Sequence, residues 1–199
     1  MQVIATDVLD TKEKMVNMAQ EQLKKPGFAI DPYFYRSHVT YQSELEHIIF
    51  KSWLYAGHIS QIPNKGDYFL FDIGEDSIII CRDRKEEIHA MHNMCRHRGA
   101  RVCEEPSGNC RVFACPYHGW GYALDGTLKA ARDMRDVEGF NFEDYGLLHV
   151  RMEIFQGMIF INCDPDAPDF KKPLSKISKQ LGAYDLENAK VAELSLIHI

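Results

Sequence analysis

The chain has 199 residues, of which 45% are hydrophobic and 26% charged, a composition that predicts a packed core. Its net charge of −6 argues against nucleic acid as a partner, because binding to phosphates needs clustered lysine and arginine. The chain contains no apolar run of membrane-spanning length and no secretory signal, so we expect no membrane partner and a cytoplasmic location.

The N-terminal part predicts two helices. The first is expected over residues 8–25, where Asp10 and Glu13 form a capping signature. Its apolar face contains Met15, Ala19 and Leu23. A second helix is expected to start near Ser43, with Glu46 three residues on. Its apolar face contains Leu45, Ile48, Ile49 and Trp53.

The pattern then changes to short apolar runs that predict β-strands. The expected strands are residues 68–73, 77–82, 88–93, 111–114, 121–124 and 158–162. A charged run at 82–87 and Asp125-Gly126 predict hairpin turns. Residues 130–145 are expected to form a polar loop, and residues 170–189 a further helix. Short strands with frequent turns favour a mainly β fold, an all-β sandwich or open barrel.

Two short runs carry the chemistry of this chain. Cys95 and His97 form a C-x-H run, and Cys115 and His118 form a C-x-x-H run after seventeen intervening residues. Each run supplies one thiolate and one imidazole. This set of ligands suits an asymmetric two-iron cluster, with both cysteines on one iron and both histidines on the other.

Zinc, a disulfide and chance placement each account for these residues less well. Zinc also binds two cysteines and two histidines, but its fingers space them as C-x2-4-C and H-x3-5-H. A disulfide between Cys95 and Cys115 would leave both histidines unexplained. Chance placement would not explain the flanking Arg98-Gly99 and Gly119-Trp120.

With these flanks, the pattern resembles a Rieske [2Fe–2S] domain, and most closely the N-terminal domain of Rieske non-haem iron oxygenase α subunits. The resemblance implies a Rieske-type β-sandwich or open barrel with an N-terminal helical arm, with both ligand loops at one tip. High-potential Rieske proteins add a disulfide between the loops, at positions that align with Ala100 and Tyr117. Neither is cysteine, which favours the oxygenase type. The stretch 44–58 resembles the helix that leads into this domain.

The resemblance also implies a function. In the family, NAD(P)H electrons arrive from a reductase or ferredoxin, and the cluster passes them to a mononuclear Fe(II) for O2-dependent hydroxylation or demethylation. Family members form homotrimers. Residues 126–134 and 157–162 resemble the subgroup that oxidises quaternary ammonium compounds, with aromatic substrates as the second possibility. The alternatives are a freestanding Rieske ferredoxin that only carries electrons and a structural zinc module.

We expect four segments: an arm over residues 1–40, the Rieske domain over 41–165, and a linker over 166–193 towards a missing catalytic domain. The last segment, 194–199, matches the translation of a sequencing adapter. Because the expected mononuclear Fe(II) site would lie in that missing domain, no catalytic residue is assigned.

The remaining candidates are given structural roles. Trp120 is expected to cover the cluster, and the arginines of the first loop to pair with Glu104 and Glu105. Small core residues are expected at Cys81 and Cys163. Neither a metal site nor a disulfide is expected for Cys103 and Cys110, and His89 and His92 are expected at the surface.

Overall fold

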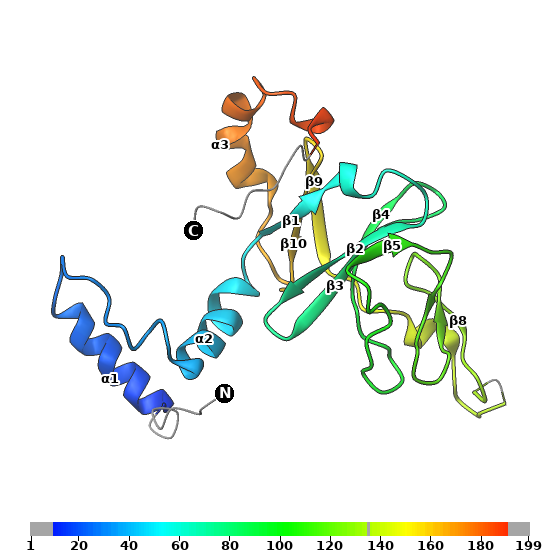
Figure 1. The fold of residues 1–199 in the computed structure, drawn as a ribbon, viewed down its shortest axis with the longest axis horizontal. Coiled ribbons are helices and arrows are strands. Elements are labelled where there is room, and N and C mark those ends of the chain that lie inside the picture. Colours follow the sequence, from blue (N-terminus) through cyan, green and yellow to red (C-terminus); the bar gives the residue numbers. More distant parts are fainter. Residues whose placement is uncertain (1–9, 135, 191–199) are drawn as a thin grey trace. The chain divides into compact units, whose positions relative to one another are not determined.

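The computed structural model (Figure 1) describes residues 10–134 and 136–190. The chain separates into two compact units at Ser52 and Trp53, and each is described by itself. The predicted domain boundaries stay predictions. The adapter-like segment 194–199 lies outside the described residues. No helix in the described part is long and apolar enough to cross a membrane.

The first helix of the N-terminal unit is α1 (Lys12–Leu23), which lies inside the predicted range. Its cap differs from the prediction, because the Thr11 side chain accepts the N–H of Lys14 at 3.2 Å. The Asp10 carboxylate is used elsewhere: it accepts the Tyr33 hydroxyl at 2.7 Å and the Val39 N–H at 3.1 Å. Asp10 therefore ties the start of α1 to the start of the next helix.

The prediction for the second helix was wrong at both ends. Helix α2 (His38–Glu44) starts earlier, because Ser37 caps it by accepting the N–H of Thr40 at 2.9 Å. It continues as a π-helical turn over Leu45–Ile49. The following stretch is not helical, since Leu54–His58 forms strand β1. The partner of β1 lies about a hundred residues later in the chain, so local periodicity could not reveal the strand.

The second unit is built from three antiparallel sheets (Figure 1). The first has the order β1-β10-β9, with β10 at Met158–Asn162 and β9 at Arg151–Phe155. The second has the order β4-β3-β2-β5, with strands Ile88–His92, Asp76–Arg82, Asp67–Ile73 and Ser107–Asn109. The third has the order β6-β7-β8, with strands Phe113–Ala114, Gly121–Tyr122 and Leu128–Ala130.

This architecture confirms the mainly β prediction, and each of the six predicted strands is present, three of them shortened. Four strands were missed: β1, β5, β8 and β9. Strand β5 is exposed and polar, so only its backbone pairing with β2 makes it a strand. Beyond the sheets, the polar loop contains a 3-10 turn at Phe142–Tyr145, and helix α3 covers Lys171–Leu181.

Strand β3 divides two hydrophobic cores. Ile78 and Ile80 face the core shared with β10, whereas Ile79 and Cys81 face the core beneath the two ligand loops. Successive side chains of a strand point to opposite faces, so a strand with a core on each side is apolar throughout. Cys81 is a buried core residue as predicted, and Cys163 packs against the other core.

Candidate metal centre

The first ligand loop is a tight turn that carries Cys95 and His97. The Cys95 N–H donates to the Ala100 carbonyl at 2.8 Å, and the Gly99 N–H donates back to the Cys95 carbonyl at 2.9 Å. Gly99 has a φ of +76°, a left-handed conformation that glycine adopts without steric cost. The sequence Arg98-Gly99 thus turns the chain directly after the histidine.

The second ligand loop repeats this hydrogen-bonding pattern. The Cys115 N–H donates to the Trp120 carbonyl at 2.8 Å, and the Gly119 N–H donates to the Cys115 carbonyl at 3.0 Å. Gly119 has a φ of +71°. The two loops are therefore equivalent turns, and each presents one thiol and one imidazole.

The four predicted residues come together. The rings of His97 and His118 lie 4.7 Å apart between centroids. The thiols of Cys95 and Cys115 are both buried. Burial raises the pKa of the Cys115 thiol, and the adjacent, hydrogen-bonded Cys95 thiol raises it further. Two thiols and two imidazoles from separate loops thus converge at one end of the β unit.

The two imidazoles lack partners for buried nitrogen atoms. Nδ1 of His97 and Nδ1 of His118 are both buried and form no hydrogen bond within the described part of the chain. A buried polar atom left unsatisfied costs about 1–3 kcal/mol. Burial lowers the pKa of His97, and His118 and Arg98 lower it further, which favours the neutral form that binds metal. The residues present therefore fit a metal group with mixed thiolate and imidazole ligands.

A second set of metal-binding side chains lies close together outside the two loops. Among the described residues, the group of three metal-binding side chains whose donor atoms all lie within 4.8 Å of one another is Asp83, Glu87 and His89, not the loop residues. The Asp83 carboxylate accepts the N–H groups of Lys85 and Glu87 and so closes the β3–β4 turn. This role in the turn explains why these three side chains lie close together.

Aromatic rings cover both imidazoles. The buried Trp120 ring stacks on His97 with centroids 4.9 Å apart and an interplanar angle of 8°. The exposed Tyr117 ring stacks on His118 at 3.9 Å. The edges of Phe140 and Tyr145 pack against Trp120. Trp120 was predicted to cover the cluster, and in the structure its ring covers the imidazole of His97.

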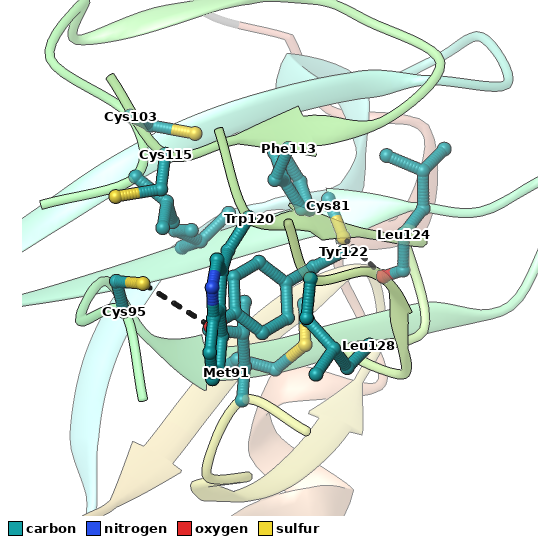
Figure 2. Packing of buried hydrophobic residues seen from close by; sticks show 14 residues of the cluster. Cys81, Met91, Cys95, Cys103, Phe113, Cys115, Trp120, Tyr122, Leu124 and Leu128 are labelled. Atoms are coloured by element: carbon teal, nitrogen blue, oxygen red, sulfur yellow. Dashed lines mark hydrogen bonds between the residues drawn. The ribbon is translucent and has the colours of Figure 1, made fainter. Parts of the chain in front are cut away.

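The sequence analysis did not predict that Tyr122 contacts the site. Its ring is fully buried, and its hydroxyl lies 3.2 Å from Cys95 Sγ (Figure 2). The hydroxyl oxygen also accepts the Arg96 N–H at 3.0 Å. A buried tyrosine usually finds a partner for its O–H group. A tyrosine in a short strand directly after the second loop was the signal available.

The arginines of the first loop do not pair as predicted. Arg101 reaches Asp72 at 3.6 Å instead of Glu104 or Glu105, because its side chain points to the β2–β3 hairpin. Arg96 and Arg98 form no ion pair with any described residue.

The remaining cysteines are free thiols, as are Cys95 and Cys115. A hollow of about 520 Å³ opens beside both imidazoles, and residues 132–134 also line it.

Comparisons with known proteins identify the family of this domain. Residues 52–141 match the Rieske [2Fe-2S] domain family. The chain is 42% identical over 141 residues to biphenyl 2,3-dioxygenase subunit alpha of Rhodococcus jostii, covering 70% of this chain and 31% of that protein. It is 34% identical over 166 residues to the glycine betaine monooxygenase oxygenase subunit of Pseudomonas aeruginosa, covering 83% and 38%.

Solved structures give the same result. The quaternary ammonium Rieske monooxygenase CntA superimposes with a TM-score of 0.70 at 31% identity, covering 81% of this chain and 45% of that one. Naphthalene 1,2-dioxygenase from Rhodococcus sp. superimposes with a TM-score of 0.73 at 30% identity, covering 86% and 40%. The chain contains a Rieske [2Fe–2S] domain, and its homologues are Rieske oxygenase α subunits, matched over their N-terminal part. It spans less than half the length of these relatives.

Proposed function

We propose that Cys95, His97, Cys115 and His118 bind the [2Fe–2S] cluster of an oxygenase and that this domain receives its electrons. The observation that carries the proposal is the pair of buried, unpartnered imidazole nitrogens, which come from the same two loops as two buried thiols. When bound, the cluster supplies a one-electron carrier whose imidazole ligands raise its potential above that of an all-cysteine cluster.

The thiols and the imidazoles of the site differ in their exposure to solvent. Cys95 and Cys115 are buried, whereas His97 and His118 are half-buried and border the hollow. Trp120 excludes water on the core side. The imidazole edges are therefore the shortest route for an electron between this domain and a partner.

For the intact protein we propose a Rieske oxygenase that receives NAD(P)H electrons through a reductase or ferredoxin and works as a cytoplasmic homotrimer. Its mononuclear Fe(II) would lie in a further domain. Quaternary ammonium compounds are the favoured substrates, supported by the motifs at 126–134 and 157–162 and by the long alignment with the glycine betaine enzyme. Aromatic compounds are second, supported by the biphenyl dioxygenase relative.

The cluster proposal is tested by anaerobic expression, metal and sulfide analysis, and EPR after reduction. We expect about two irons and two sulfides per chain, lost in Cys115→Ser and His118→Ala. His38→Ala, a change in the N-terminal unit, is the matched control and should keep the cluster. A colourless chain with one zinc, or a His118→Ala variant with full iron content, would contradict the proposal.

The substrate proposal is tested on the oxygenase that carries this domain, supplied with a reductase, NAD(P)H and O2. Glycine betaine or carnitine should be consumed with matching O2 uptake, and biphenyl should not. Consumption of biphenyl and not of glycine betaine or carnitine would show that the substrates are aromatic compounds. That result would leave the cluster proposal unchanged.

A further inference from the structure

Asn93 lies at the base of the first ligand loop and uses its whole hydrogen-bonding capacity there. Its side chain is buried. Oδ1 accepts the N–H groups of Val102 and Cys103, both at 2.9 Å. Nδ2 donates to the Cys103 carbonyl at 2.7 Å and to Ser77 Oγ at 3.2 Å. A side-chain amide has two acceptor lone pairs and two N–H groups, so nothing is left over.

The two ligand loops differ at this point, although their turns are alike. Below the second loop, β6 and β7 pair as a ladder, with Phe113 opposite Tyr122 and Ala114 opposite Gly121. None of the strands in the described residues pairs across the base of the first loop. There, the amide of Asn93 joins the incoming arm to the outgoing arm at residues 102–103.

Aspartate and leucine, which have the same branched shape as asparagine, could not form all of these hydrogen bonds. Aspartate of the same shape could accept the two N–H groups but could not donate to the Cys103 carbonyl. Leucine would leave the buried N–H groups of Val102 and Cys103 without partners, and each buried unsatisfied group is costly. The environment therefore selects an amide of this length.

We propose that Asn93 is a positioning residue for the cluster: it sets the separation of the two arms of the first loop, and so the placement of Cys95 and His97. This inference rests on the proposed cluster site. Tyr122 holds the tip of the same loop through the Arg96 N–H. His97 is held against the core by stacking on Trp120. When the base opens, the first imidazole and thiol move relative to the second pair.

The decisive variant is Asn93→Leu, which keeps the branched shape and the number of heavy atoms and removes all four hydrogen bonds. Two controls accompany it. Ser77→Ala removes the one bond that does not reach the loop, and Ile161→Val trims the other hydrophobic core. Three readouts are followed: hydrogen exchange of the Val102 and Cys103 amides, the rate of cluster loss to a chelator, and the EPR line width of the reduced chain.

We expect Asn93→Leu to speed exchange at both amides and to broaden the EPR lines. We also expect it to speed cluster loss by about 10–100-fold, the factor by which removal of a ligand-orienting group typically weakens metal affinity. Ser77→Ala and Ile161→Val should leave line width and cluster loss unchanged. If Asn93→Leu lowers the urea midpoint but keeps the wild-type line width and cluster loss, Asn93 is only structural and the inference is wrong.

A folding failure of Asn93→Leu would not end the test. Asn93→Asp keeps both accepted bonds, so it should retain amide protection and lose the cluster more slowly than Asn93→Ala. Equal loss from these two variants would also overturn the inference. Failure of the proposed function is distinguishable, because the wild-type chain would then bind no cluster while amide exchange at the loop still reported the hydrogen bonds.

Discussion

The phenol oxygen of Tyr122 lies 3.2 Å from Cys95 Sγ (Figure 2) and 3.0 Å from the backbone nitrogen of Arg96. As a thiolate ligand Cys95 would have no proton to donate, so the Tyr122 hydroxyl would donate to the sulfur while its oxygen accepts the Arg96 N–H. Burial raises the pKa of Tyr122, so the phenol keeps its proton. One buried hydroxyl therefore joins the core to a proposed cluster ligand.

The change Tyr122→Phe should lower the reduction potential of the cluster. A hydrogen bond donated to the ligand sulfur stabilises the more negative, reduced state, so its loss favours the oxidised state. The expected decrease is on the order of tens of millivolts, from a hydrogen bond worth about 1 kcal/mol. A redox titration measures it. Tyr117→Phe is the control, since that exposed ring stacks on His118 instead. An unchanged potential in Tyr122→Phe would contradict the prediction.

Removing the Trp120 ring should destabilise the domain strongly. The ring is buried against His97, Phe140 and Tyr145, and Trp→Ala changes in cores cost about 3–5 kcal/mol. Urea unfolding of Trp120→Ala measures the loss, and Trp120→Phe, which keeps a ring beside His97, should lose less. A Trp120→Ala variant within about 1 kcal/mol of wild type would mean that the aromatic contacts carry little of the stability.

The change Gly119→Ala tests the turn of the second loop. Gly119 has a φ of +71°, and an added Cβ would meet no atom within 4 Å. The cost therefore comes from backbone strain alone, about 1–2 kcal/mol. Gly119→Asn should cost less, because asparagine tolerates this conformation better. Both are compared by urea unfolding, and equal stability of the alanine variant and wild type would show that the loop relaxes to another conformation.

Acid should loosen the N-terminal unit at Asp10. The hydrogen bond from Tyr33, together with those from Ser37 and the Val39 N–H, lowers the pKa of Asp10 from 3.8 to about 2. A carboxylate with a lowered pKa stabilises the folded state fully above its unfolded pKa. This stabilisation is lost as the pH falls from 3.8 through about 2.

The measurement is an NMR titration of the Val39 amide between about pH 5 and pH 1. Asp10→Asn is the control, because it keeps an acceptor oxygen and does not titrate in this range. A Val39 signal that changes in the same way in both proteins would refute the role of Asp10.

The amino-acid sequence alone determined the fold class and supplied the proposed donor set. Cys95, His97, Cys115 and His118 were recognisable as candidate ligands because residue type and spacing are local properties that can be read without coordinates. The six strands found in advance were runs of apolar residues, since burial in a core leaves its pattern in the chain. The Rieske assignment followed from the same local residues.

Only the tertiary structure showed the strands and side-chain contacts whose partners are distant in the sequence. Strand β1 exists because it pairs with β10, and polar β5 because it pairs with β2. The same holds for side chains around the site. Asn93 closes the first loop through residues nine and ten positions later, and Tyr122 reaches Cys95 from across the core. Such contacts follow from how the chain returns on itself, a property that no local pattern of residue types records.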